Sequence, residues 1–265
     1  MAADEPAVSS RLNRLWRIVG TGLSFLAFGV GGVLLGVLAF PLINLIARDP
    51  ATRRRWSRRL VQRSFAFHFG LMRALGVLTF EVRGRERLDR DGLLILANHP
   101  TLIDVVLLVS LLPNADCVVK SSLARNPFTR GPVRAAGYVC NDDGAGLIDD
   151  CIAAVRRGGA LVIFPEGTRS ARNAPLRLQR GAANIAVRGR LDITPVLLSC
   201  TPMTLGKGEK WYHVPARRFH VVAEVQPDIE VAPFLDEGQG EALAARRLTE
   251  YLTRYFRGGE LRAGT

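Results

Sequence analysis

Cysteine is scarce in this sequence. The 265 residues include four, at Cys117, Cys140, Cys151 and Cys200. They are scattered, with no closely spaced pair of the kind that binds a metal ion. Such sparse, unpaired cysteines indicate a reducing compartment rather than a disulfide-rich one. We therefore predict no metal site.

Acidic residues are also few. The chain has 24 Asp and Glu against 36 Lys and Arg, which gives a formal net charge of +12. Nucleic acid, an anionic membrane and an acidic protein all attract such a chain. Nucleic acid is the least favoured, because no basic stretch is interleaved with stacking aromatics in a known module, and we predict no such partner. The basic residues gather beside an apolar N-terminal segment, which favours a membrane surface.

Charged residues are absent from Ile18 to Ala47. About twenty apolar residues suffice to span a bilayer, so this run is long enough. A secretory signal peptide is disfavoured, because the run is too long and no small-residue cleavage site follows it. Gly32 and Gly36 make a GxxxG pair, which can let another helix approach, but we interpret them as points of flexibility.

A second helix, Leu60 to Leu78, follows a cluster of arginines between positions 53 and 59. Two arrangements are open. In one, the apolar run spans the membrane and the arginines hold the rest of the chain in the cytoplasm. In the other, both helices dip into one leaflet as a hairpin. We divide the chain into a membrane-anchoring segment, 1–78, and a globular domain, 79–265.

The globular domain alternates short apolar strands with amphipathic helices. This alternation predicts an α/β fold, a mixed sheet flanked by helices on both faces. The predicted strands are Phe80–Arg83, Leu93–Ala97, Cys117–Val119, Tyr138–Cys140, Leu161–Phe164, Ile193–Ser199 and Phe219–Val225. The predicted helices are Val105–Leu112, Ala145–Arg157, Gly181–Arg188 and Glu241–Phe256.

The stretch Leu93–Asp104, LLILANHPTLID, carries the first candidate site. The apolar run ends before His99, and Pro100 delays a helix that Thr101 is placed to cap. Asp104 then falls in the first turns, where its carboxylate can fold back onto the imidazole. That contact would fix the ring's tautomer and make His99 a base for an alcohol proton. By spacing alone, a loop histidine beside a helix-capping aspartate is an equal interpretation.

The stretch Leu161–Ser170, LVIFPEGTRS, carries the second. An apolar strand leads into a turn with Glu166, Gly167, Thr168 and Arg169. Arg169 has a fork of donors suited to a phosphate, and Gly167 permits close backbone approach. For Glu166 and Arg169 the alternative is a surface ion pair in a tight turn. Both stretches follow strands, which agrees with a site at the carboxyl edge of the sheet.

Together the two stretches resemble the glycerolipid acyltransferases, specifically the 1-acylglycerol-3-phosphate O-acyltransferase family. NHPTLID resembles the family's catalytic His-x4-Asp block and FPEGTRS its acceptor-binding block, and the resemblance extends over about 80–199. It implies that His99 is the general base and Asp104 its orienter. It also implies that Glu166 to Arg169 bind the acceptor and that Lys120 opens an intermediate block, although a plain strand-end lysine is an equal interpretation of Lys120. Independently, Asn98 can set the His99 loop through side-chain hydrogen bonds.

The resemblance implies a membrane-bound enzyme that moves a fatty acyl group to the free hydroxyl of a lysophospholipid such as 1-acylglycerol-3-phosphate. The donor would be acyl-CoA or acyl carrier protein (acyl-ACP), a thioester co-substrate, and no further cofactor is expected. The thioester is already activated, so no covalent serine is required. We expect a bacterial inner membrane, with the catalytic domain facing the cytoplasm.

One position departs from the family pattern. Where the family usually has an Asp–Arg pair, this chain has Asn141 and Asp142, so a negative charge replaces a phosphate-binding one. Two alternatives therefore stay open. One is the same chemistry on a non-standard acceptor, such as a lyso-aminolipid or a specialised lipid. The other is a non-catalytic lipid-binding protein that keeps the fold.

Overall fold

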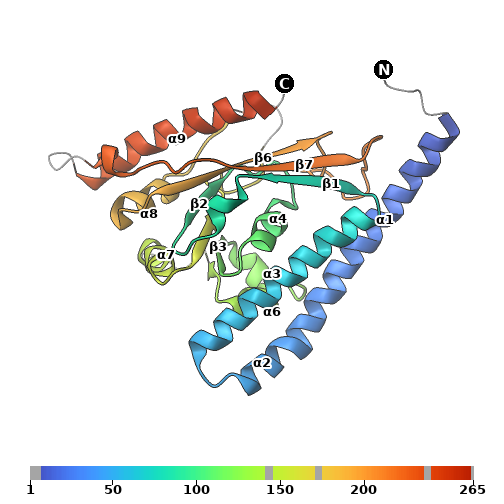
Figure 1. Cartoon of the computed structure of the whole chain (residues 1–265), viewed down its shortest axis with the longest axis horizontal. Helices are drawn as coiled ribbons and strands as arrows, with labels where there is room; N and C mark the ends of the chain where they lie inside the picture. Colours follow the sequence, from blue (N-terminus) through green and yellow to red (C-terminus); the bar gives the residue numbers. More distant parts are fainter. Residues whose placement is uncertain (1–6, 141–145, 171–174, 236–239, 264–265) are drawn as a thin grey trace.

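The N-terminal part of the chain forms two long antiparallel helices (Figure 1). We describe residues 7–140, 146–170, 175–235 and 240–263 of a computed structural model. The first helix is continuous through three segments: α1 (Ala7–Leu34), a π-helical turn (Leu35–Ala39) and α2 (Phe40–Ile46). The chain then reverses into α3 (Pro50–Ala74).

The start of α3 is fixed by its sequence. Asp49 accepts a hydrogen bond from the Thr52 N–H at 2.7 Å, and Pro50 occupies the first helical position, where no backbone donor is needed. The helix thus begins ten residues before the predicted Leu60 and includes the arginine cluster. Among the described residues, one helical stretch, Arg11–Ile46, is long and apolar enough to cross a membrane by length and composition.

The glycine pair of the first helix has a packing role. A Cβ on Gly32 would lie 2.3 Å from the Phe128 carbonyl oxygen, and a Cβ on Gly131 would lie 2.6 Å from the Gly36 Cα. Side chains at these positions would force the backbones apart. Our interpretation of Gly32 and Gly36 as points of flexibility was therefore wrong, because the pair lets the segment 128–131 approach the helix.

Seven strands form one mixed sheet, in the order β1-β7-β6-β2-β5-β3-β4. β7 runs antiparallel to β6, and the other neighbours are parallel. The carboxyl ends of β2, β5, β3 and β6 therefore share one edge, at which β7 and β1 begin. The strands are β1 (Leu78–Arg83), β2 (Leu94–Ala97), β3 (Ala115–Val119), β4 (Val139–Cys140), β5 (Ala160–Ile163), β6 (Ile193–Thr201) and β7 (Phe219–Val225).

Helices cover both faces of the sheet and bury two apolar clusters (Figure 1). Alternation along β2 shows the division, since Ile95 and Ala97 belong to the cluster under α3 and α4, while Leu94 and Leu96 belong to the cluster under α8 and α9. The helices are α4 (Asp104–Leu111), α5 (Ser121–Arg125), α6 (Arg130–Ala136), α7 (Leu147–Arg156), α8 (Gly181–Gly189) and α9 (Glu241–Ala263). The predicted α/β class with a mixed, helix-flanked sheet is confirmed.

Two helices, α5 and α6, were not predicted. Asn126 and Pro127 lie between them and Gly131 and Pro132 lie within α6, and these residue types are typical of loops. Pro132 nevertheless lies in the first turn of α6, where its missing N–H removes no helical hydrogen bond. The other predicted elements are present with ends shifted by a few residues, and α9 continues beyond the expected Phe256.

Helix α3 belongs to the core of the α/β fold. Its Val61, Phe69 and Met72 are buried in the same cluster as strand residues. Arg58 forms a buried ion pair with Asp116 on β3, donates to the Asn114 side chain at 3.0 Å, and donates to the Ala136 carbonyl at 2.9 Å. The division of the chain at residue 78 stays a prediction, and α3 is packed as part of the sheet's covering layer.

Candidate active site

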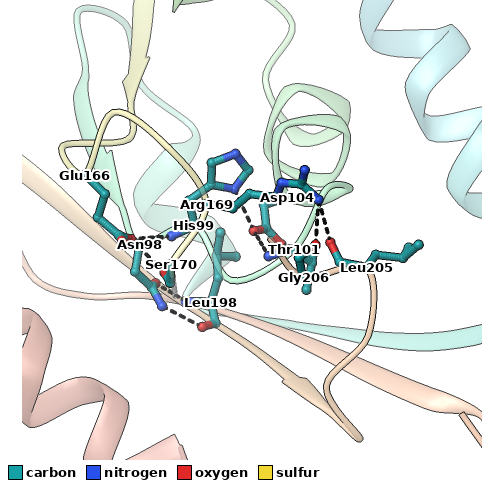
Figure 2. A network of polar contacts seen from close by, with 10 residues as sticks. All are labelled: Asn98, His99, Thr101, Asp104, Glu166, Arg169, Ser170, Leu198, Leu205 and Gly206. Atoms are coloured by element: carbon teal, nitrogen blue, oxygen red, sulfur yellow. Dashed lines mark hydrogen bonds and ion pairs between the residues drawn. The ribbon is translucent and has the colours of Figure 1, made fainter. Parts of the chain in front are cut away.

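Asn98 fixes the end of β2 against its neighbour. Its side-chain amide donates to the Leu198 carbonyl at 2.8 Å and accepts from the Leu198 N–H at 2.7 Å. The side chain is 5% exposed, so these bonds are shielded from water. The predicted anchoring of the loop by Asn98 is confirmed, and it sets where the next residue, His99, leaves the sheet (Figure 2).

His99 and Asp104 are in contact. The imidazole Nδ1 lies 2.9 Å from the Asp104 Oδ2. The aspartate side chain is 0% exposed and the histidine side chain 15%, so the pair is sheltered while the ring keeps an opening to the outside. A carboxylate on Nδ1 places the ring proton there and leaves Nε2 as the basic nitrogen. The ring also packs on Phe164, with centroids 4.2 Å apart.

Thr101 does not cap the helix as predicted. Helix α4 begins at Asp104, and Ile103 at the N-cap position makes no side-chain hydrogen bond. Instead, the Thr101 N–H donates to Asp104 Oδ2 at 2.6 Å and the Thr101 hydroxyl donates to Oδ1. Asp104 is therefore the hydrogen-bond acceptor and Thr101 the donor. The Asp104 carboxylate satisfies a loop N–H and lies at the helix start, where the helix dipole favours negative charge.

Two opposing effects act on the Asp104 carboxyl. Burial raises its pKa above the ordinary value, and the hydrogen bonds from His99 and Thr101 act in the opposite direction by stabilising the ionised form. Burial is the larger effect. The hydrogen bonds are therefore needed to keep a charge in this position, and removing either donor makes protonation easier.

Glu166 joins the turn of the second motif to the loop of the first. Its Oε1 accepts from the His99 N–H at 2.9 Å and from the Ser170 hydroxyl at 2.8 Å. The Ser170 N–H in turn donates to the His99 carbonyl at 2.8 Å. His99 is thus held through both backbone polar groups as well as through its ring (Figure 2).

Arg169 points toward a different loop. Its Nη1 donates to the carbonyls of Leu205 at 3.0 Å and Gly206 at 2.8 Å. The alternative interpretation, a Glu166–Arg169 surface ion pair, is wrong, because these two side chains have separate partners within the described residues. Nε and Nη2 of Arg169 make no hydrogen bond to the described parts of the chain, so they are available to an anion.

Three predicted site residues, Gly167, Thr168 and Lys120, make no hydrogen bond to the His99, Asp104, Glu166 and Arg169 side chains within the described part of the chain. Gly167 has φ +69°, a conformation that favours glycine, and its N–H donates to Phe164 at 3.0 Å to close the turn. Thr168 is exposed beside it. Lys120 is exposed at the end of β3, on the same sheet edge but two strands away from β2.

Sequence reasoning did not assign the Ser170 bonds or the carbonyls of Leu205 and Gly206. Ser170 lies four residues after Glu166 within the quoted motif, so its hydroxyl was a detectable signal. Leu205 and Gly206 carry none, since they contribute main-chain oxygens from a loop thirty-six residues further along. Asn141 and Asp142, the departure from the family pattern, lie outside the described residues. Among the described residues no His, Cys, Asp or Glu cluster could hold a metal ion.

Comparison with known proteins finds a family match over the middle of the chain. The sequence profile of the family described as Acyltransferase matches residues 79–199, the part that holds both motifs. Residues 79–199 thus carry the sequence pattern of this acyltransferase family. A 1-acyl-sn-glycerol-3-phosphate acyltransferase of Saccharomyces cerevisiae is 29% identical over 63% of this chain and 55% of its own length. One from Helicobacter pylori is 27% identical over 63% of this chain and 71% of its own length.

The fold has a counterpart among solved structures. The 1-acyl-sn-glycerophosphate (LPA) acyltransferase PlsC from Thermotoga maritima superposes with a TM-score of 0.68 at 21% identity. The match covers 93% of this chain and 98% of the other, so it includes the N-terminal helices. At this identity the likeness establishes the fold. The chain spans about half the length of the yeast relative and of a Caenorhabditis elegans relative.

Proposed function

We propose that this acyltransferase-family chain is a membrane-bound O-acyltransferase that acylates the free hydroxyl of a lysophospholipid. The observation that carries the proposal is the His99–Asp104 pair, with Nδ1 held at 2.9 Å by a fully buried carboxylate. Nε2 is thus left as the basic nitrogen of a side chain that keeps 15% of its surface accessible at the carboxyl edge of the sheet. A general base in that state suits proton removal from an alcohol.

The proposed reaction needs one base and no covalent enzyme intermediate. Nε2 of His99 takes the acceptor's hydroxyl proton as the oxygen attacks the thioester carbonyl. The tetrahedral intermediate then collapses, the carbon–sulfur bond breaks, and the imidazolium returns its proton to the leaving thiolate. Asp104 stabilises the imidazolium during these steps and keeps the ring in position.

Acceptor binding is proposed for the turn after β5. Nε and Nη2 of Arg169 are the charged donors beside the catalytic pair, and charge-assisted hydrogen bonds to phosphate are strong. Lysophosphatidic acid is the first candidate acceptor, because the curated relatives are named for acylation of 1-acylglycerol-3-phosphate. Gly167 and Thr168 supply the exposed surface of the same turn, while Lys120 is a second cation on the same edge.

Membrane attachment is proposed for the first helix. Its apolar side chains are exposed along most of its length, including Leu12, Leu26, Val37 and Leu45, each more than 50% accessible. Bilayer hydrocarbon would cover them favourably. The arginines of α3 lie next to the reversal between the two helices, where anionic headgroups would attract them. We propose that the active site faces the cytoplasm of a bacterial cell, where both thioester donors are made.

The test is a panel of acceptors given to the purified full chain in detergent, with acyl-CoA or acyl-ACP as donor. We expect acylated product from lysophosphatidic acid. Product from a lyso-aminolipid but little from lysophosphatidic acid would point to the non-standard acceptor suggested by Asp142. No product with any lysolipid and either donor would contradict the proposed activity and favour a lipid-binding protein. Reactions without donor provide the control.

A further inference from the structure

The loop between β6 and β7, residues 202–218, which we call the β6–β7 loop, connects the catalytic cluster to the first helix. It leaves the sheet at the edge where His99 lies, since β6 runs parallel to β2. Internal hydrogen bonds give it a defined shape: the Gly206 N–H donates to Glu209 at 3.0 Å, and the His213 N–H donates to the Lys210 carbonyl at 3.0 Å.

At one end the loop holds the catalytic region. The Leu205 carbonyl accepts from the Leu102 N–H at 3.0 Å and from Arg169 at 3.0 Å, and Gly206 accepts from Arg169 as well. Leu205 is 4% exposed and has φ +56°, a left-handed conformation that a leucine adopts only under the constraint of its surroundings. The position of this end is therefore tied to the segment between His99 and Asp104.

At the other end the loop packs on the first helix. The Trp211 ring lies 3.3 Å from the point where a Cβ on Gly22 would stand, and its centroid is 6.3 Å from that of Phe25. Arg17 donates to the Ala216 carbonyl. These contacts place the loop directly against the exposed apolar helix α1, which Figure 1 labels.

The outer side of the loop combines apolar and basic side chains. Met203, Trp211 and Tyr212 are 37–44% exposed. Four basic residues accompany one acid, so the loop carries a net charge of +3 (4 − 1). The basic residues are Lys207, Lys210, Arg217 and Arg218, all exposed, and the single acid, Glu209, is used by Gly206. Tryptophan and tyrosine favour the boundary between lipid and water, and lysine and arginine favour anionic headgroups.

We propose that the β6–β7 loop is a second membrane contact, which rests on the headgroups of an anionic bilayer and holds the His99–Asp104 pair near the lipid surface. The inference rests on the proposed membrane-bound function, because the occupant is the bilayer in which the first helix is anchored. The loop's basic charge complements an anionic surface, and its contact with α1 places Trp211 beside the anchor. Leu205 and Gly206 link the loop by hydrogen bonds to Leu102 and Arg169, so a membrane contact of the loop also helps to position the segment that carries the catalytic pair.

The test follows the fluorescence of Trp211 in the full chain reconstituted into vesicles. Replacing Trp16 and Trp56 by phenylalanine leaves Trp211 as the single reporter. Bromine-labelled phospholipids quench a tryptophan that touches them. We expect quenching of Trp211 in vesicles that contain phosphatidylglycerol, less in neutral phosphatidylcholine vesicles, and a decrease with added salt, since exposed charges are screened. A chain that retains only Trp16 reports whether α1 is inserted.

Charge reversal tests the role of the basic residues. Lys207→Glu with Lys210→Glu should reduce the anionic-specific quenching of Trp211. It should also raise the KM for a vesicle-borne acceptor by about fivefold per altered residue or more, while leaving a short-chain, monomeric acceptor unaffected. The matched control is Arg156→Glu with Arg157→Glu at the end of α7, exposed basic residues on the other layer, which should change neither readout.

Two outcomes would overturn the inference. Trp211 that stays unquenched while Trp16 is quenched would show that the loop does not meet the bilayer. A Lys207→Glu, Lys210→Glu variant that loses activity with acyl-ACP alone, with quenching unchanged, would assign the surface to the acidic carrier protein instead. Quenching needs no turnover, so its result stands apart from the acceptor panel, whose failure would count against the proposed activity.

Discussion

At the scale of single residues, Asp104 has three donors aimed at its two oxygens: the His99 ring, the Thr101 N–H and the Thr101 hydroxyl. An amide in its place would present an NH2 group to at least one of these donors. We therefore expect Asp104→Asn to disturb the His99 tautomer as well as remove its charge support. kcat should fall roughly a thousandfold or more, as when a buried orienting aspartate is lost elsewhere.

Steady-state transfer at saturating donor and acceptor would measure this loss. An unchanged midpoint of thermal unfolding would exclude a folding defect, and Asp149→Asn on the surface of α7 is the matched control. An Asp104→Asn enzyme within tenfold of wild-type kcat would count against the orienting role.

Arg169 has two separable tasks in our account. Losing its remaining donors to a phosphate should cost about 2 kcal/mol, roughly a thirtyfold drop in kcat/KM for a phosphate-bearing acceptor. Losing its bonds to the β6–β7 loop should act on all acceptors alike. Comparing kcat/KM of Arg169→Ala for acceptors with and without phosphate separates the two. Equal losses for both would leave Arg169 with the loop-holding task only.

The His99–Asp104 contact was predicted from two signals together: a spacing that allows it across a strand-to-helix corner, and the resemblance of both motifs to an acyltransferase family. Neither signal could predict which partners Arg169 would choose. Main-chain carbonyls have no side-chain signature, and the left-handed Leu205 that presents one is held there by tertiary packing. The same holds for Thr101, whose hydroxyl can either cap a helix or donate to a carboxylate.

At the scale of elements, the joint between α3 and β3 depends on Arg58. Its guanidinium is 6% exposed and pairs with Asp116, which is 3% exposed. Arg58→Ala would leave a buried carboxylate without its partner, and we expect a loss of about 3–5 kcal/mol in the free energy of unfolding. Thermal unfolding in detergent would show it. Arg59→Ala, exposed on the same helix, is the control.

A double variant sharpens this prediction. Arg58→Met with Asp116→Leu removes both charges and fills similar volume, so much of the stability should return. If Arg58→Ala unfolds at the wild-type temperature, the pair does not hold α3 to the sheet.

His68 gives α3 a pH dependence. Burial beside Phe28, whose ring centroid lies 5.0 Å away, lowers the pKa of His68 to about 4. The unfolded chain binds the proton near pH 6.5, whereas the folded chain resists it until about pH 4. Stability is therefore fully present above pH 6.5 and falls as the pH decreases toward 4, by up to about 3 kcal/mol.

Thermal unfolding between pH 7 and pH 4 checks this expectation. His68→Leu should flatten the part of the pH dependence that this group contributes. If the pH dependence of thermal unfolding is the same in His68→Leu as in wild type, His68 does not contribute to it and the lowered pKa is contradicted.

The strands and most helices could be predicted, because period-two and helical apolar patterns identify elements that bury a face. Helices α5 and α6 could not, since their proline and glycine signals are shared by loops and by first helical turns. The glycines of the first helix were misjudged for a related reason. Close packing against Phe128 and Gly131 depends on a segment a hundred residues away, which local sequence does not specify.

At the scale of the whole molecule, the antiparallel packing of α3 against the first helix limits both membrane arrangements. Because α3 belongs to the core of the α/β fold, the first helix must lie on the side of the molecule that α3 covers. The β6–β7 loop contacts the N-terminal half of the first helix at Arg17 and Gly22. In our proposal this contact keeps the loop beside the membrane anchor, near the edge of the sheet where His99 lies.

The central claim is that Nε2 of His99 is the base for acyl transfer, and the most direct measurement is single-turnover transfer by His99→Ala beside wild type. Both proteins would be reconstituted in the same vesicles with lysophosphatidic acid and labelled acyl donor. We predict a loss of at least about a thousandfold in the rate of transfer, with thermal stability and vesicle association unchanged. Transfer by His99→Ala at a near-wild-type rate would contradict the account.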